Sequence, residues 1–274
     1  MAAATRLRRL LEDPESFVLC PGKYDGFSAR VALEVGFDSL YMTGAGSSAS
    51  VLGHEDLGLL TQTQMRTNAE AIADLGALPE NANGPIPVIA DADTGYGGPI
   101  MVARTVQQYA KSGVAGLHMK TKCRRSDADI SQERRFWTKM SSTSAFVLRY
   151  LRGNAINRLE GTYAAGADVT FFEGLTSKEQ ASKIIRDVSP MPVLLNMVES
   201  GATPSYSAAE AREAGFKIII VPFVTIVPPY LAMKAELQHL KSRGAMTAES
   251  KKMAPQDLFR ICGVDAAFRS SSGV

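Results

Sequence analysis

Short apolar runs alternate with longer segments of helical periodicity along most of this chain, and this alternation restricts the possible folds more than any other feature. The predicted strands are Phe17–Cys20, Ser39–Thr43, Pro87–Asp93, Gly116–Met119, Ala145–Arg149, Asp168–Glu173, Pro192–Asn196 and Lys217–Pro222. Eight strands that alternate with helices are typical of a parallel sheet closed into a (β/α)8 barrel of the TIM type, with an open doubly wound sheet as the alternative.

No Gly/Ser-rich or Pro-rich linker divides the 274 residues, so the sequence predicts one domain over residues 1–274. The predicted helices between strands are Ser28–Val35, Thr61–Leu75, Ile100–Ser112, Ser177–Val188 and Ala208–Ala214. From about residue 226 the chain continues as a helical extension, with helices predicted over Pro229–Arg243 and Pro255–Cys262.

The charge balance gives no reason to expect a nucleic acid or an anionic membrane as partner, because 30 Lys and Arg face 28 Asp and Glu. The basic segment 120–139 is interpreted as a solvated loop or helix face rather than a nucleic-acid patch. No apolar run is long enough to cross a membrane.

The three cysteines are far apart in the sequence, which is typical of a reducing compartment, and we expect a cytoplasmic protein. The basic start of the chain, with Arg6, Arg8 and Arg9, has two interpretations. We favour an amphipathic first helix packed on the body over a mitochondrial presequence.

The third predicted strand ends in two acidic residues, Asp91 and Asp93, followed by the glycine-bracketed turn Thr94–Gly97. Residues two apart on a strand face the same side, and at the carboxyl end of a barrel strand that side is the mouth of the active site. Two carboxylates without His or Cys neighbours suit a hard cation such as Mg²⁺. The alternative is a turn in which an Asp caps the next helix.

Polar or small residues also follow other predicted strands. Gly44–Ser48 follows the second strand and is predicted to be a turn whose backbone N–H groups can meet an anion. Glu173 ends the sixth strand and Asn196 the seventh, with Glu199 close behind. Side chains gathered from several strand ends indicate an active site.

Several segments together resemble the isocitrate lyase/phosphoenolpyruvate mutase superfamily, and most of all its branch of oxaloacetate hydrolase, dimethylmalate lyase and methylisocitrate lyase. The segments are Pro21–Arg30, Gly36–Gly46, Asp91–Gly97, Gly113–His118 and Asn196–Pro204. The resemblance implies a (β/α)8 barrel that uses Mg²⁺, with Mn²⁺ as the alternative. It also implies cleavage of C–C or C–P bonds in small 2-oxo or 2-hydroxy acids, and a homotetramer whose subunits exchange their eighth helix.

The resemblance also implies roles for individual residues. Asp91 and Asp93 match the acids of the metal site, and Asp56 matches an acid of the ion's outer coordination sphere. A substrate carboxylate is expected on Thr43, Gly44 and Ala45. Arg149 would bind a second carboxylate, Glu173 and Asn196 would orient the remaining oxygens, and Lys122 and Cys123 would belong to the catalytic loop.

The chain departs from the family pattern between His118 and Ala165. If the segment is aligned to the family without gaps, Lys120 takes the position of a metal-linked Glu. If it is aligned with a short deletion, Lys122 and Cys123 match the family's catalytic loop and the Glu is absent. The Gly-His that follows the family's Cys is missing, and the segment looks shortened, so the barrel is expected to be altered or incomplete around its fourth and fifth strands.

Two functional hypotheses follow from these features. The first is a Mg²⁺-dependent C–C lyase or hydrolase for a small dicarboxylic acid of the oxaloacetate, methylisocitrate or dimethylmalate type. The second is a catalytically impaired or inactive member, either a pseudoenzyme or the product of a truncated or mis-spliced gene model, that serves in binding or assembly. C–P chemistry on phosphonopyruvate is a third and lesser alternative. The histidines His54, His118 and His239 are interpreted as packed or solvated residues rather than ligands.

Overall fold

The computed structural model describes residues 2–78, 81, 84–120, 146–151 and 167–264 of the chain, and for residues 120 and 146–151 it describes the backbone alone. Eight parallel strands form a closed barrel in which each strand pairs with the next along the chain. The strands are β1 (Val18–Lys23), β2 (Leu40–Met42), β3 (Val88–Asp91), β4 (Gly116–Lys120), β5 (Phe146–Leu151), β6 (Val169–Phe172), β7 (Val193–Asn196) and β8 (Ile218–Val221).

The barrel closes between its first and last strands, where Val18 pairs with Ile218. Each predicted strand overlaps one of the eight observed strands, and the predicted (β/α)8 barrel is confirmed. β5 pairs with both neighbours, through Gly116↔Phe146 to β4 and Leu148↔Val169 to β6. The segments 121–145 and 152–166, on which the expected shortening falls, lie outside the described residues.

The helices follow the predicted pattern along the chain, and most of them cover the outside of the barrel. They are α1 (Ala3–Glu12), α2 (Gly26–Val35), α3 (Gly44–Leu52), α4 (Gln62–Gly76), α5 (Pro99–Lys111), α8 (Lys178–Asp187), α9 (Ala208–Glu213), α10 (Val227–Arg243) and α11 (Pro255–Ile261), with a 3-10 turn at Ser250–Lys252. Local sequence sets several of their ends. Asp25 and Ser28 form a reciprocal capping box at the start of α2, and Gly36 ends that helix with φ of 94°.

The inside of the barrel is an apolar layer made by alternate strand residues. Leu7 of α1 is fully buried against this layer, so α1 covers one end of the barrel. The strand residues of this layer include Val18, Cys20, Tyr41, Ile89, Val169, Phe171, Leu194, Ile218 and Ile220. The intervening strand residues face outward and pack against the helices. The alternation leaves the opposite end of the barrel for polar side chains.

One local prediction is wrong. The small residues Gly44–Ser48 were expected in a turn, whereas they begin the helix α3, whose N-cap is Thr43. Thr43 has extended dihedral angles and its hydroxyl accepts a hydrogen bond from the N–H group of Gly46, at 3.3 Å, so it provides the start signal for the helix.

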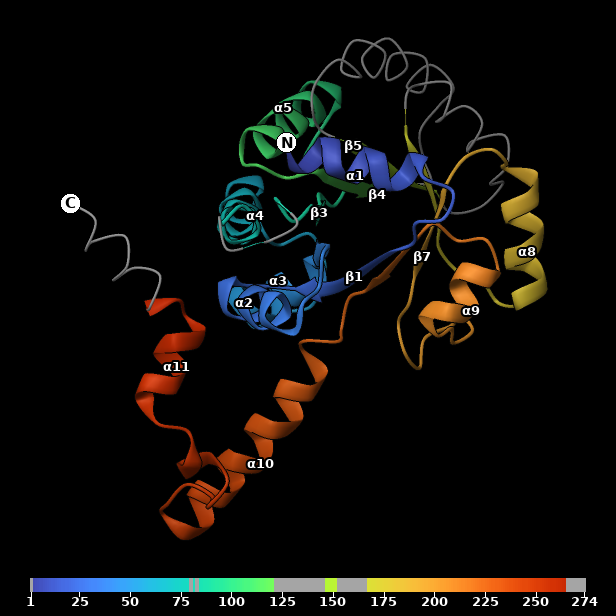
Figure 1. Ribbon diagram of the computed structural model, residues 1–274. Coiled ribbons are helices and arrows are strands. Elements are labelled where there is room, and N and C mark those ends of the chain that lie inside the picture. Colours follow the sequence, from blue (N-terminus) through green and yellow to red (C-terminus); the bar gives the residue numbers. More distant parts are fainter. Residues whose placement is uncertain (1, 79–80, 82–83, 121–145, 152–166, 265–274) are drawn as a thin grey trace.

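The C-terminal helices leave the barrel. Figure 1 shows α10 projecting away from it, while α11 turns back and contacts α2. No residue of α10 is buried, although Tyr230, Met233, Leu237 and Leu240 follow one another at spacings of three and four. Among the described residues, no helix combines the length and apolar character that a membrane crossing requires.

Candidate functional site

A cavity of about 300 Å³ lies at the carboxyl ends of the strands. Its position follows from strand alternation, because the residues two positions beyond the inward-facing Tyr41, Ile89, Phe171 and Leu194 also face inward. Those residues are polar. The cavity is lined by Tyr41, Thr43, Ala45, Asp56, Asp91, His118, Phe171, Glu173, Asn196, Val198, Pro222 and Phe223. Six of these, Thr43, Ala45, Asp56, Asp91, Glu173 and Asn196, were singled out from the sequence.

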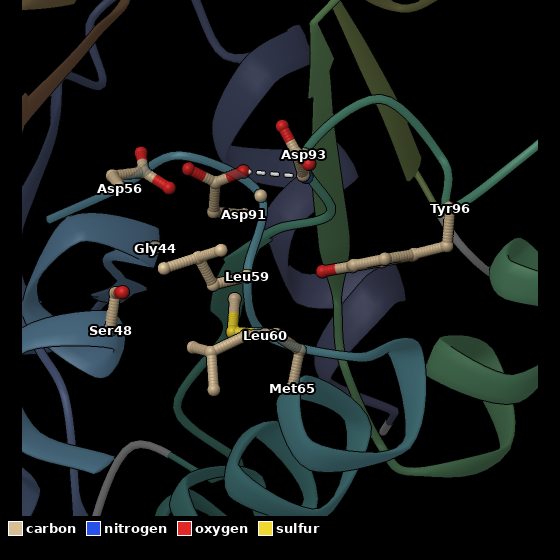
Figure 2. Close-up of a pocket in the computed structure, with 10 residues that line it drawn as sticks. Gly44, Ser48, Asp56, Leu59, Leu60, Met65, Asp91, Asp93 and Tyr96 are labelled. Atoms are coloured by element: carbon tan, nitrogen blue, oxygen red, sulfur yellow. Dashed lines mark hydrogen bonds between the residues drawn. The ribbon is translucent and has the colours of Figure 1, made fainter. Parts of the chain in front are cut away.

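A second, smaller cavity of about 10 Å³, roughly the space that one water molecule needs, adjoins the first. It holds the other two predicted residues that the structure describes, Gly44 and Asp93. Asp56 and Asp91 line both cavities. Figure 2 shows the carboxylates of Asp56, Asp91 and Asp93 in one group at the end of β3, with Tyr96 reaching toward them from the other side.

Asp91 and Asp93 come together differently from the prediction. β3 ends at Asp91, and Asp93 lies beyond the strand with φ of 45°, so the pleat does not orient it. Instead, the N–H group of Asp93 donates to Oδ1 of Asp91 at 2.7 Å. The carboxylate of Asp91 therefore closes a tight turn, and this turn positions the carboxylate of Asp93.

Two glycines leave the space that the carboxylates of Asp91 and Asp93 occupy. A Cβ atom on Gly44 would lie 2.7 Å from Oδ2 of Asp91, and one on Gly58 would lie 3.1 Å from Oδ2 of Asp93. Asp91 is 3% exposed, so it has little freedom to move away. The close approach of α3 and of the 54–60 loop to the two acids depends on these glycines.

The N-terminus of α3 is suited to binding an anion. The N–H groups of Gly44 and Ala45 have no hydrogen-bond partner within the described part of the chain, as expected for the first residues of a helix. The positive end of the helix dipole adds to their attraction for a carboxylate. Ala45 lines the large cavity and Gly44 the small one beside it.

The floor of the large cavity is a buried polar network that was not predicted. The hydroxyl group of Tyr41 lies 3.2 Å from Nδ1 of His118 and 3.4 Å from Oδ2 of Asp91. His118 is 3% exposed and packs edge-on against Phe171, as expected for a packed residue. The contact of its Nδ1 atom with Tyr41 was not predicted. Burial, followed by the negative charge of Asp91, raises the pKa of Tyr41 well above its usual value of 10, and the phenol keeps its proton. The alternation of residues on β2 could have revealed this network from the sequence, because it places the side chain of Tyr41 inside the barrel.

The remaining walls differ in polarity. Asn196 has a buried Oδ1 atom without a hydrogen-bond partner among the described residues, and it lines the cavity from the end of β7. A buried acceptor of this kind is suited to a ligand that carries a donor. Glu173 is exposed at the end of β6, while Phe171, Val198, Pro222 and Phe223 form an apolar wall.

The residues that could hold a divalent cation are Asp91 and Asp93, with Asp56 beside them. Within the described part of the chain no three His, Cys, Asp or Glu side chains form a ready metal cluster. Oxygen donors from two carboxylates, together with waters, are nevertheless what Mg²⁺ uses in many proteins, and the donor set fits that ion.

Three predicted residues fall outside the described side chains. Lys122 and Cys123 lie in the segment 121–145. Arg149 is placed only by its backbone in β5, where it pairs with Met119 on one side and Thr170 on the other. Lys120 ends β4 and pairs with Tyr150.

Comparison with families and curated proteins gives a consistent result. The family model described as phosphoenolpyruvate phosphomutase matches residues 7–241. The 2,3-dimethylmalate lyase of Eubacterium barkeri is 34% identical over 256 residues, covering 86% of this chain and 84% of that protein. The 2-methylisocitrate lyase of Halalkalibacterium halodurans is 32% identical, covering 91% of this chain and 86% of that protein.

Solved structures agree with these relatives. A 2,3-dimethylmalate lyase, a PEP mutase/isocitrate lyase superfamily member, has a TM-score of 0.91 at 46% identity and covers 100% of this chain and 99% of its own. An oxaloacetate acetylhydrolase in complex with the inhibitor 3,3-difluorooxalacetate has a TM-score of 0.90 at 39% identity, covering 99% and 97%. A phosphonopyruvate hydrolase complex with oxalate and Mg²⁺, with a TM-score of 0.83 at 19% identity over 100% of this chain and 99% of its own, shares the fold.

Proposed function

Because this chain belongs to the phosphoenolpyruvate phosphomutase family, within the PEP mutase/isocitrate lyase superfamily of enzymes, we propose that it is a Mg²⁺-dependent lyase or hydrolase that cleaves a C–C bond in a small 2-oxo or 2-hydroxy dicarboxylic acid. The observation that carries the proposal is the cavity itself. It brings Thr43, Ala45, Asp91, Glu173 and Asn196 together from four different strand ends. The relatives whose names specify dimethylmalate, methylisocitrate and oxaloacetate support this substrate class.

In this proposal Asp91 and Asp93 hold Mg²⁺ and Asp56 acts from its outer coordination sphere. When bound, the ion would stabilise the negative charge that develops on substrate oxygens as the C–C bond breaks. The chain's own part is to present the two carboxylates in a fixed arrangement, through the turn after β3 and through the contacts with Gly44 and Gly58.

The other residues bind and orient the substrate. One substrate carboxylate is held by the N–H groups of Gly44 and Ala45 at the start of α3. With a 2-hydroxy acid, the Oδ1 atom of Asn196 accepts a hydrogen bond from the substrate hydroxyl, which would satisfy this buried atom. Glu173 orients a further oxygen at the mouth of the cavity. The protonated phenol of Tyr41 keeps Asp91 and His118 in place.

Three assignments rest on the sequence and its resemblance, because these side chains lie outside the described ones. Arg149 would bind the second carboxylate in a bidentate manner. In the cleavage of a 2-hydroxy acid a base takes the hydroxyl proton as the C–C bond breaks, and Cys123, with Lys122 beside it, would donate a proton to the departing carbon. Surrounding Lys and Arg residues favour a reactive thiol at this position.

A substrate panel tests the proposal. Oxaloacetate, dimethylmalate, methylisocitrate and phosphonopyruvate are each incubated with the protein and Mg²⁺, and we expect turnover of at least one of the three C–C substrates. Turnover of phosphonopyruvate alone would replace C–C with C–P chemistry. Absence of any turnover by a folded protein would favour the inactive member.

A matched pair of variants tests the metal site. Asp91→Asn should lower kcat/KM by at least about 100-fold and remove the rise in melting temperature that Mg²⁺ causes, since an ion bound only by the native state stabilises that state. Asp74→Asn changes an exposed acid of α4 in the same way and should behave like the unmodified protein. An undiminished Mg²⁺ response in Asp91→Asn would refute the assignment.

We also propose that the protein is a homo-oligomer, a tetramer in which α10 packs on a neighbouring subunit. Two exposed apolar surfaces of the same chain support this. One is the stripe Tyr230, Met233, Leu237 and Leu240 on α10, and the other comprises Phe27, Val31 and Val35 on α2. A helix with no buried residue gains its stability from packing that the single chain does not supply.

The proposed compartment is the cytoplasm. The thiols of Cys20 and Cys262 are free, the first buried and the second exposed, which suits reducing conditions. An exposed free thiol is prone to oxidation in an oxidising compartment. Localising the full-length protein in cells tests the proposal.

A further inference from the structure

The turn that carries the acids has an unusual backbone. Asp93 and Tyr96 both have positive φ, at 45° and 60°, although neither is glycine. Gly95 and Gly97 also have positive φ, at 83° and 150°. Non-glycine residues rarely adopt a positive φ, and they keep it only where surrounding contacts hold them. The contacts that hold this turn therefore matter for the position of Asp93.

Helix α5 supplies those contacts. The hydroxyl of Tyr109 donates to the main-chain carbonyl of Asp91 at 3.2 Å, and the hydroxyl of Tyr96 lies 3.4 Å from that of Tyr109. One turn earlier on α5, Oγ1 of Thr105 donates to the carbonyl of Gly95 at 3.1 Å. The turn is thus connected to α5 at its first residue, at Gly95 and at Tyr96.

Burying the hydroxyl group of Tyr109 at this position costs free energy unless the group forms a hydrogen bond. Tyr109 is fully buried in the apolar cluster between β3, α4 and α5, where an aliphatic side chain would pack without a polar atom. Its hydroxyl reaches the last carbonyl of β3. Burial raises the pKa of both Tyr96 and Tyr109, so both phenols remain protonated and able to donate at neutral pH.

The chain of hydroxyl groups also reaches the site. Tyr96 lines the small cavity together with Asp91 and Asp93, and Figure 2 shows its side chain extending from the right to a position below Asp93. The connection therefore runs from the cavity wall through Tyr109 to the main chain of Asp91, whose carboxylate in turn binds the N–H group of Asp93. Removing the middle hydroxyl would release one end of the turn from α5.

We propose that Tyr109, supported by Tyr96, is a positioning residue that fixes the Asp91–Asp93 turn and thereby the spacing of the two carboxylates. The part of this inference that concerns Mg²⁺ and turnover rests on the proposed function. The part that concerns the turn rests on the contacts alone.

Tyr109→Phe tests the inference by removing only the hydroxyl. Tyr206→Phe is the matched control, because Tyr206 is also buried, at 5% exposure, and its hydroxyl has no partner among the described residues. Hydrogen–deuterium exchange of the peptide 91–97 is measured by mass spectrometry. Loss of the hydrogen bond should speed this exchange about fivefold in Tyr109→Phe and leave it unchanged in Tyr206→Phe.

Mg²⁺ binding and kinetics provide the functional readout. In Tyr109→Phe we expect an Mg²⁺ dissociation constant raised by roughly tenfold and a similar fall in kcat, with KM for the substrate little changed. Tyr96→Phe, which keeps the bond from Tyr109 to Asp91, should show a smaller change in the same direction. It serves as the second variant if Tyr109→Phe folds poorly.

The outcomes separate this inference from the proposed function. Exchange of peptide 91–97 that is equal in Tyr109→Phe and Tyr206→Phe overturns the inference whatever the activity. Faster exchange with an unchanged Mg²⁺ affinity and kcat also overturns it, because the hydroxyl would then be merely structural. A third outcome is faster exchange in Tyr109→Phe together with an unmodified protein that neither binds Mg²⁺ nor turns over any substrate. This outcome supports the fixed turn and contradicts the proposed function.

Discussion

A Cβ atom on Gly44 would lie 2.7 Å from Oδ2 and 3.0 Å from Cγ of Asp91, so the start of α3 and the end of β3 meet with no side chain between them. The contact joins the two halves of the candidate site. Gly44 belongs to the surface suited to a carboxylate, and Asp91 to the group of acids suited to a cation. A change at either residue is therefore expected to disturb both.

Gly44→Ala should displace the Asp91 carboxylate, because that side chain is buried and is held by the N–H group of Asp93. We expect kcat/KM to fall by about 10- to 100-fold and the Mg²⁺-dependent rise in melting temperature to shrink. Gly26→Ala is the control, since its Cβ would only reach Leu75 at 3.6 Å, an ordinary contact. Full activity in Gly44→Ala would show that the acid can shift without consequence.

Tyr41→Phe should remove the hydroxyl that lies between Nδ1 of His118 and Oδ2 of Asp91. Two buried polar groups lose a partner, so we expect the free energy of unfolding to fall by about 1–2 kcal/mol and kcat/KM to fall at least tenfold. Denaturant unfolding and steady-state kinetics measure these effects, with Tyr206→Phe again as control. A stability loss without any loss of activity would make the network part of the fold alone.

Lys23→Met should stabilise the protein at neutral pH. Lys23 ends β1 with 2% of its surface exposed, its Nζ atom has no partner among the described residues, and burial lowers its pKa from 10.5 to about 8. The folded state therefore carries the cost of a buried charge below pH 8. Removing that charge should raise the free energy of unfolding by about 1–3 kcal/mol at pH 7.

The sign of the pH dependence distinguishes this cause from better packing. Between about pH 8 and 10.5 the unfolded Lys23 keeps its proton while the folded one loses it, so the stability of the unmodified protein rises with pH. The advantage of Lys23→Met should accordingly shrink over that range. Lys111→Met, at an exposed position on α5, should show neither effect. A gain for Lys23→Met that is independent of pH would exclude the charge as its cause.

Leu237→Asp should break up the proposed oligomer, because it places a charge within the apolar stripe of α10. Gln238→Asp introduces the same charge at the next residue, outside that stripe, and should assemble normally. Analytical ultracentrifugation gives the mass of each species. A monomeric unmodified protein, or a Leu237→Asp variant that remains assembled, would contradict the packing of α10 on a neighbouring subunit.

The sequence by itself determined the barrel and which strand ends would carry several of the residues that line the large cavity. Strand and helix periodicities are local properties of the chain, so eight alternating strands could be found without knowing any contact. Parallel strands present their carboxyl ends at one rim, and that rule predicted Asp91, Glu173 and Asn196 at the same end of the barrel, where they line one cavity together with Thr43, which the resemblance had added.

Only the tertiary structure decided how these residues are held. Tyr41, Asp91 and His118 are 27 or more residues apart, so no pattern within a segment could reveal their network. The turn that places Asp93 depends on a left-handed backbone, and its support by Tyr109 comes from a separate helix. The segment Gly44–Ser48, which begins α3, was likewise predicted to be a turn, because small residues have weak intrinsic preferences and packing on the barrel selects their conformation. Periodicity is a property of neighbouring residues, whereas the geometry of a site arises from contacts between distant ones.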